Sequence, residues 1–267
     1  WMGSLLILAL QRYSTECDNL LNILVLKCYM YQKRLLIASD CFLPRWDGVS
    51  RFLTEVIPHL VTDYDVTVLA PDFPGDAADM PDIRVVRIPL MDWVVGDFPV
   101  PRIDMSVIHH EVKKADIVWT QTLASVGGNA LRSAARHGVP ALAYIHSIEW
   151  ELVAKSLSRF NLLRKPSRFL VRQIARHLYN RCTYLMVPSE EVQEVFRYNK
   201  IHTPSSVIHL GTDTGRFCPP EDKAAAKAQL GIRSEATVIG FIGRLAREKD
   251  LLTLYRAFIR LQRDHKD

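Results

Sequence analysis

The sequence predicts an α/β protein with two Rossmann-like domains, the second only partly present. Three observations carry this prediction. Short apolar runs alternate with helical patterns from residue 34 onward, residues 212–236 interrupt the alternation, and it starts again at residue 237. Strands separated by helices of this length indicate βαβ units and a mostly parallel sheet. A chain of 267 residues, 48% of them hydrophobic, is long enough to bury such a core.

The first domain is expected over residues 34–211. Segments rich in apolar and β-branched residues are expected to form its strands, over 34–39, 65–71, 83–89, 115–121, 140–146, 183–189 and 205–211. Helices are expected over 50–61 and over 126–138, the second closed by a glycine cap. Ser189, followed by two glutamates, is expected to cap a further helix.

The next two segments are expected to lead into a second domain. Residues 212–236 read as an inter-domain linker, with two consecutive prolines and a short alanine-rich helix. Residues 237–267 read as the start of the second domain, with a strand, a loop and a helix. Because a Rossmann-like domain needs roughly another hundred residues to close its core, we expect the chain to stop inside this domain.

Residues 1–33 are expected to be a non-native or disordered extension. Its two short apolar runs fall well below the ~20 apolar residues that span a bilayer. No basic stretch precedes the first run, which argues against a signal peptide. The five cysteines are scattered without a C-x-x-C pair, which indicates reduced cytosolic thiols rather than disulfides or a zinc site.

Ligands of open α/β sheets bind outside the carboxyl ends of the strands, and two stretches of the first domain lie there. Gly48 stands at the start of a helix, where backbone N–H groups are expected to be open to an anion. A glycine needed only for the turn is the alternative. His146 lies at the end of a strand. A lone histidine is usually structural, but this edge of the sheet favours a functional role more than other positions do.

A third stretch lies at the start of the second domain. Gly243 ends the expected strand, Arg244 follows it, and Lys249 lies at the mouth of the next helix. A guanidinium grips phosphate oxygens bidentately and an ammonium acts as a point charge. Both beside a helix N-terminus would make a site for two phosphates. A solvated loop, partly neutralised by Glu248, is the alternative that these residues alone leave open.

Together these stretches resemble a known family. The segments "PRWDGVSRFL", "VPSEEVQEVF", "VIHLGTDTGRF" and "GFIGRLAREKDLLTLYRAF", with the strand-end His146, occur in the order and spacing of the retaining family-4 glycosyltransferases of GT-B fold. The resemblance covers residues 34–267, and the G-R-L-x-x-E-K match is its most specific part. It implies two facing Rossmann-like domains, with a nucleotide-sugar donor bound mainly by the second domain and the acceptor by the first.

The resemblance also implies roles for the marked residues. Gly243, Arg244 and Lys249 would bind the donor diphosphate, and the two cations would stabilise the charge that grows on it during transfer. Gly48 would let the first domain approach the same diphosphate, and His146 would contact the transferred sugar. No metal or other cofactor is expected.

Two further expectations follow from the same resemblance. Asp213, in a G-x-D segment, is expected to have a structural or hinge role. The family's acidic E-x7-E motif would lie beyond Asp267, so we expect residues 1–267 alone to lack transferase activity.

Residues 152–189 hold eight lysines or arginines and no acidic residue. Four of the eight are spaced four apart and form a stripe on one helix: Arg164, Arg168, Arg172 and Arg176. With Lys165 they make up the expected membrane or acceptor surface. Like charges four residues apart repel by a few tenths of a kcal/mol per pair, which favours an anionic partner such as a membrane surface. A merely solvated face is an equal alternative. Nucleic acid is not expected, because no stacking aromatic set or binding motif accompanies the charge.

The sequence thus predicts a retaining glycosyltransferase that moves a sugar from a nucleoside-diphosphate sugar to an acceptor. A membrane lipid or glycolipid is the candidate acceptor, and a cytoplasmic protein peripheral to the inner face of the membrane is the expected location. A nucleotide-sugar epimerase of the same architecture, or a non-enzymatic module that binds anionic lipid or nucleic acid, are the alternatives. The donor nucleotide and sugar are left open.

Overall fold

The structure is a computed structural model that describes residues 32–76, 80–95, 98–156, 161–243, 245 and 249–264. The expected N-terminal extension lies outside the described residues up to position 31, and Arg244 lies outside them too. The side chain of Arg164 is likewise outside this description.

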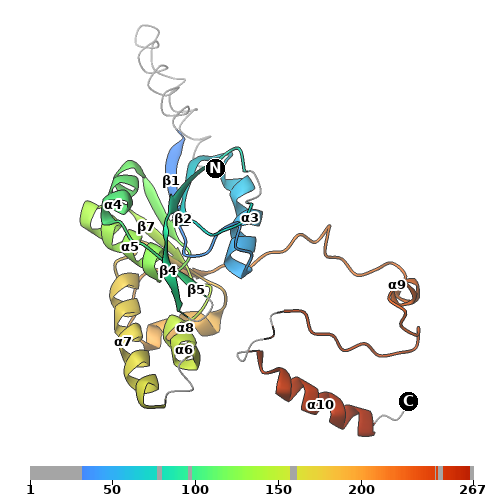
Figure 1. The fold of residues 1–267 in the computed structure, drawn as a ribbon. Coiled ribbons are helices and arrows are strands. Elements are labelled where there is room, and N and C mark those ends of the chain that lie inside the picture. Colours follow the sequence, from blue (N-terminus) through green and yellow to red (C-terminus); the bar gives the residue numbers. More distant parts are fainter. Residues whose placement is uncertain are drawn as a thin grey trace, which may run out of the picture.

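The core of the molecule is a seven-stranded sheet in the order β3-β2-β1-β6-β7-β8-β9 (Figure 1). Every neighbouring pair runs parallel. The strands are β1 (Lys33–Ala38), β2 (Tyr64–Pro71), β3 (Arg84–Ile88), β6 (Ile117–Thr120), β7 (Ala141–Tyr144), β8 (Tyr184–Val187) and β9 (Ser205–Val207). Each predicted strand of the first domain therefore forms, and the predicted parallel sheet is confirmed. The boundaries 34–211 given to that domain stay a prediction.

Helices cover both faces of this sheet. They are α3 (Gly48–Leu60), α4 (Met105–Lys114), α5 (Ser125–His137), α6 (Glu149–Ser156), α7 (Asn161–Tyr179) and α8 (Glu190–Tyr198). Successive residues of β1 point to opposite faces: Leu35 and Ile37 pack with Leu53 of α3, whereas Leu36 packs in the cluster that holds Val126 of α5. A strand that is buried on both faces has a continuous run of apolar residues, and this run made β1 predictable from the sequence.

The helix ends follow the predicted chemistry. Gly138 closes α5 in the left-handed conformation, with φ of 68°. Ser189 caps α8 by accepting a hydrogen bond from the Val192 amide at 3.4 Å. Both predicted caps are confirmed.

A two-stranded antiparallel hairpin was not predicted. It comprises β4 (Leu90–Val95) and β5 (Phe98–Pro101) and lies between β3 and α4 along the chain. Pro99 and Pro101 weaken the strand signal of β5, because proline cannot donate to a β-ladder.

The strand order reverses between β1 and β6. From β1 the chain moves outward to β2 and β3, then returns to β6 on the other side of β1. In such sheets the loops after these two strands diverge and leave a crevice at their carboxyl ends. Because β1, β6 and β7 are parallel neighbours, the residues that follow them all lie at the same carboxyl edge of the sheet.

The part assigned to the second domain lies away from this sheet (Figure 1). It holds α10 (Leu251–Asp264), and the expected linker before it holds α9 (Lys223–Gln229), so both predicted helices form. The strand expected to begin at residue 237 does not: residues 237–243 are irregular, and Val238 and Ile242 are exposed. Among the described residues no strand lies beside this segment, so its backbone has no ladder to join.

Candidate functional site

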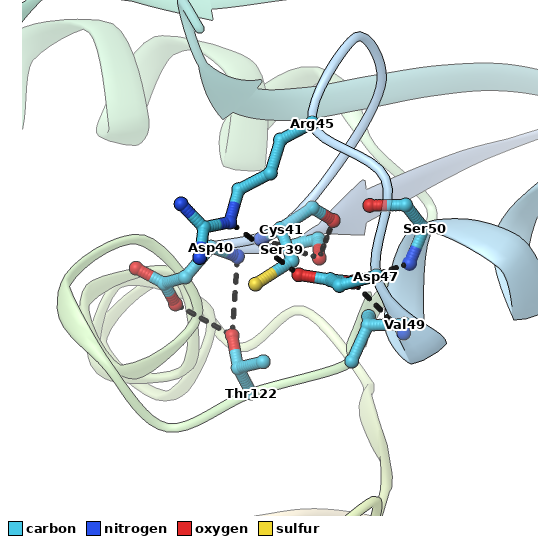
Figure 2. Close-up of polar contacts among 8 residues, drawn as sticks. All are labelled: Ser39, Asp40, Cys41, Arg45, Asp47, Val49, Ser50 and Thr122. Atoms are coloured by element: carbon cyan, nitrogen blue, oxygen red, sulfur yellow. Dashed lines mark hydrogen bonds and ion pairs between the residues drawn. The ribbon is translucent and has the colours of Figure 1, made fainter. Parts of the chain in front are cut away.

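The carboxylate of Asp40, two residues after β1, caps α5 from across the switch point. It accepts hydrogen bonds from the Val126 amide at 2.7 Å, the Gly127 amide at 3.1 Å, the Ser125 hydroxyl at 2.9 Å and the Thr122 hydroxyl at 2.5 Å. Figure 2 shows the bond to Thr122. The N-terminus of α5 is a place where Rossmann-like folds often hold a phosphate. Here the chain's own carboxylate fills it.

Close packing at this helix start depends on Gly127. A Cβ atom there would lie 1.9 Å from the Thr122 carbonyl oxygen and 2.3 Å from the Thr120 hydroxyl. Both distances are far below van der Waals contact, so only glycine lets α5 begin this close to the end of β6.

The start of α3 is capped by Asp47. Its Oδ1 accepts from the Val49 amide at 3.0 Å and the Ser50 amide at 2.9 Å, and Arg45 pairs with the other oxygen at 3.7 Å (Figure 2). The expectation that N–H groups beside Gly48 are open to an anion is therefore wrong for these two amides. A Cβ at Gly48 would meet no atom within 4 Å, so packing within the described residues does not require glycine there.

Cys41 lies in the same loop but is poorly suited to act as a nucleophile. Burial is the main cause that raises the pKa of its thiol, and a hydrogen bond to Asp47 adds to it. The reactive thiolate is thus disfavoured near neutral pH.

His146 lies two residues past β7, at the same edge. Its Nε2 is 2.9 Å from Oε1 of Gln121, the residue that follows β6. Its ring packs edge-on against Phe52 of α3, with centroids 5.1 Å apart, and lies 4.7 Å from the ring of Tyr144. Burial lowers the pKa of His146 to about 4, with Asp47 opposing the shift. The imidazole is therefore neutral near pH 7 and can exchange hydrogen bonds without carrying charge.

The predicted site residues are only partly brought together. Gly48 and His146 lie at the same carboxyl edge of the sheet, since Phe52, about one helical turn after Gly48 in α3, contacts the His146 ring. Gly243 and Lys249 lie on the segment that extends away from the sheet (Figure 1), and Lys249 is exposed just before α10. The two halves of the predicted site are thus apart in this structure.

Asp213, the expected hinge residue, organises a local turn. Its Oδ1 accepts from the Gly215 amide at 2.9 Å and the Arg216 amide at 3.1 Å. Nearby, Arg51 of α3 lies over the Phe217 ring at 5.2 Å and donates to the Thr212 hydroxyl at 3.3 Å. The start of the expected linker is thus held against α3.

The predicted basic stripe lies on α7. Lys165 and Arg168 are exposed, and Arg172 and Arg176 are half-buried. Arg168 forms an ion pair with Glu151 of α6, which partly neutralises the stripe. Glu151 immediately precedes residues 152–189, the segment that holds no acidic residue.

Three large apolar side chains accompany the stripe. Phe169 is 57% exposed, Leu170 59% and Ile174 39%. The Arg172 guanidinium lies 5.5 Å above the Phe169 ring. Exposed apolar and cationic groups therefore share this helix, as on helices that lie at a membrane surface.

Sequence reasoning missed Asp40 and Gln121. Both directly follow the buried runs that became β1 and β6, and these strands flank the switch point. A polar residue at the end of each of two neighbouring strands would have been a usable signal, but which strands are neighbours depends on the strand order, which the sequence analysis did not predict.

The described residues show neither a metal cluster nor a membrane span. Within this part of the chain, no group of three or more His, Cys, Asp or Glu side chains could hold a metal ion. No described helix is both long and apolar enough to cross a bilayer.

Two relatives are similar over most of the chain. The GDP-mannose-dependent alpha-mannosyltransferase of Corynebacterium glutamicum is 26% identical over 227 residues, 81% of this chain and 52% of that protein. The GDP-mannose-dependent alpha-(1-6)-phosphatidylinositol monomannoside mannosyltransferase of Mycolicibacterium smegmatis is 24% identical over 235 residues, 86% of this chain and 57% of that protein. The chain spans little more than half the length of these curated relatives.

Solved structures agree on the fold. The crystal structure of Anabaena Alr3699/HepE in complex with UDP-glucose matches with a TM-score of 0.56 and 18% identity, and covers 85% of this chain and 57% of that one. The described sheet and its helices therefore share the fold of this GT-B protein, of which the chain spans 57%. Residues 46–216, well over half of the chain, match the family described as Glycosyltransferase Family 4, and the chain belongs to that family.

Proposed function

We propose that this chain is part of a retaining glycosyltransferase that moves a sugar from a nucleoside-diphosphate sugar to an acceptor. The observation that carries the proposal is His146, held neutral at the carboxyl edge of a parallel sheet in a chain of this family. Two relatives are named as users of GDP-mannose, and the solved structure of the same fold is a complex with UDP-glucose. These names support a nucleotide-sugar donor without choosing its base.

Each domain has its own share of the reaction in this proposal. His146 contacts the transferred sugar, and Gly48 lets the first domain approach the donor diphosphate. Gly243, Arg244 and Lys249 bind that diphosphate from the second domain. The two cations stabilise the charge that develops on the leaving diphosphate, which is the role usually given to a metal, so transfer needs none.

Residues 1–267 alone are proposed to be inactive. In α10, Leu252, Tyr255 and Phe258 are exposed along one helix, as is Ile242 before it. An amphipathic helix of a Rossmann-like domain needs a sheet to cover its apolar side, and Arg244 and Lys249 need that sheet to aim them at the first domain. Donor binding by this chain alone should therefore be weak.

A membrane lipid or glycolipid is proposed as the acceptor, reached by a protein peripheral to the cytoplasmic face. One relative is named for a phosphatidylinositol monomannoside, which is a lipid acceptor. The basic and apolar residues of α7 would hold the first domain at an anionic surface, since each nearby basic residue contributes about 1 kcal/mol. Because Arg168 already pairs with Glu151, its own contribution should be smaller.

The transfer reaction is tested with a protein that carries the complete second domain. Radiolabelled GDP-mannose and UDP-glucose are each incubated with a bacterial lipid extract, and NMR gives the anomeric configuration of the product. Labelled lipid with the donor's configuration is expected, and His146→Ala should slow transfer about 10²-fold. The matched control is His59→Ala, an exposed histidine in the last turn of α3. Inversion, or epimerised donor without transfer, would refute the proposal.

The membrane surface is tested by cosedimentation with vesicles. Wild-type protein should bind phosphatidylglycerol vesicles and not phosphatidylcholine vesicles, with binding weakened by salt. Replacing Arg168, Arg172 and Arg176 by serine should reduce binding by about 10²-fold, corresponding to nearly 3 kcal/mol. The matched control is a serine triple at exposed basic residues of or near α4: Arg102, Lys113 and Lys114. Equal binding to the two vesicle types would reduce the stripe to a solvated face.

A further inference from the structure

Gln121 occupies an unusual position between the sheet and His146. It is the first residue after β6, its amide donates to the Ala38 carbonyl of β1 at 3.1 Å, and its side chain is only 1% exposed. Its Oε1 lies 2.9 Å from His146 Nε2. The oxygen of a buried, neutral side chain at the switch point thus has the site histidine as its hydrogen-bond partner, whereas the Nε2 of the same side chain has no partner among the described residues.

This contact decides which nitrogen of the imidazole carries the proton. A neutral imidazole has one N–H group and one acceptor nitrogen, and the carbonyl oxygen of a glutamine side chain can only accept. His146 must therefore donate through Nε2, which leaves Nδ1 as an acceptor. Among the described residues Nδ1 has no hydrogen-bond partner.

The surrounding rings hold this arrangement in place. The Phe52 ring packs edge-on against the His146 ring, and the Tyr144 ring packs against it at an angle of 43°. The Tyr144 hydroxyl is itself fixed, donating to the Ile208 carbonyl at 2.7 Å. A ring flip of His146 would have to displace these aromatic neighbours, so the hydrogen bond to Gln121 selects one orientation as well as one tautomer.

We propose that Gln121 is a positioning residue that keeps His146 in the Nε2–H tautomer and so presents Nδ1 as an acceptor for a hydroxyl group of the transferred sugar. The hydroxyl contact rests on the proposed glycosyl transfer, whereas the tautomer does not. The reverse orientation of the Gln121 amide would put N–H against Nε2 and would turn Nδ1 into a donor.

The choice of glutamine rather than glutamate fits this role. A carboxylate at the same place would also accept from Nε2, but its charge would stabilise the imidazolium and remove the acceptor on Nδ1. The charged group that already acts on His146 is Asp47, from the loop before α3, and it opposes the effect of burial. Because the Gln121 side chain is neutral, it does not add to the effect of Asp47, and the His146 ring stays neutral.

The tautomer is measured directly by long-range ¹H–¹⁵N NMR of the His146 ring. Wild-type protein should show protonated Nε2 and unprotonated Nδ1. Gln121→Leu should give a mixture of tautomers, and Gln121→Glu should raise the pKa of His146. The matched control is Gln193→Leu in α8, which loses hydrogen bonds to the Ser205 carbonyl at 3.0 Å and the Ser205 hydroxyl at 2.9 Å and should leave the His146 signals unchanged. A wild-type Nδ1–H tautomer, or an unchanged tautomer in Gln121→Leu, would overturn the proposal.

The hydroxyl contact is measured in a protein that carries the complete second domain. Gln121→Leu should lower kcat/KM about tenfold, as for the loss of one hydrogen bond. Gln121→Glu should lose activity progressively as the pH falls, because the imidazolium then has no acceptor nitrogen. A loss of the Nε2–H tautomer with kcat/KM unchanged would overturn the role given to Nδ1. Absence of transfer by the wild-type protein would instead count against the proposed function, since the NMR result does not depend on it.

Discussion

Replacing Asp40 by alanine should destabilise the first domain strongly, because this carboxylate caps a helix from another part of the chain. The amides of Val126 and Gly127 are buried and donate to it, whereas the hydroxyls of Thr122 and Ser125 are half-buried and can turn to water. Each buried amide left without an acceptor costs about 1–3 kcal/mol. Water entering the vacated space would recover part of this, so a loss of about 3 kcal/mol is expected.

Urea unfolding followed by circular dichroism and tryptophan fluorescence measures this loss. Trp119 and Trp150 are buried in the first domain and report its unfolding. The matched control is Asp104→Ala, which removes the exposed cap of α4 and should cost about 1 kcal/mol. If Asp40→Ala costs no more than Asp104→Ala, the carboxylate is an ordinary surface cap and the reasoning about the switch point fails.

Three further predictions address other parts of the chain. Burial raises the pKa of Glu149 to about 7, despite a hydrogen bond from Tyr179, so the free energy of unfolding should fall as the pH rises from about 4.5 to about 7. Glu149→Gln should remove that slope in pH-dependent urea titrations, and an unchanged slope would contradict the assignment. Gly127→Ala should lower the melting temperature sharply in calorimetry, because its Cβ would overlap the Thr122 carbonyl, and an unchanged temperature would contradict the packing. In a protein with the complete second domain, Lys249→Ala should slow transfer about 10²-fold, and an unchanged kcat/KM would make Lys249 a solvated residue.

Much of the fold was predictable because each strand of the sheet has a clear local signal. Buried parallel strands are continuous apolar runs, and residues such as Gly138 and Ser189 end or start helices through contacts within a few positions. The exceptions have physical reasons. The prolines of β5 hid a strand, and the apolar run over 237–243 lacks a partner strand among the described residues.

The candidate site was less predictable than the fold. His146 could be marked because it directly follows a strand, and the segment from Gly243 to Lys249 because its pattern resembles a family motif. The importance of Gln121 was hidden, since one glutamine after a strand has no distinctive local pattern. The cap on α3 was misjudged for a related reason: the amides after Gly48 were expected to be open, and the Asp47 side chain turned back to bind them.

By itself, the sequence determined the α/β class, the strands of the parallel sheet, most of the helices around it and a family resemblance that the comparisons confirm. Only the tertiary structure decided the strand order, and with it the meeting of Asp40 with α5 and of Gln121 with His146. Asp40 is 82 or more residues from its partners along the chain, and Gln121 is 25 residues from His146. Their hydrogen bonds exist because β1 and β6 lie side by side and β7 lies next to β6, and no local propensity encodes which strands become neighbours.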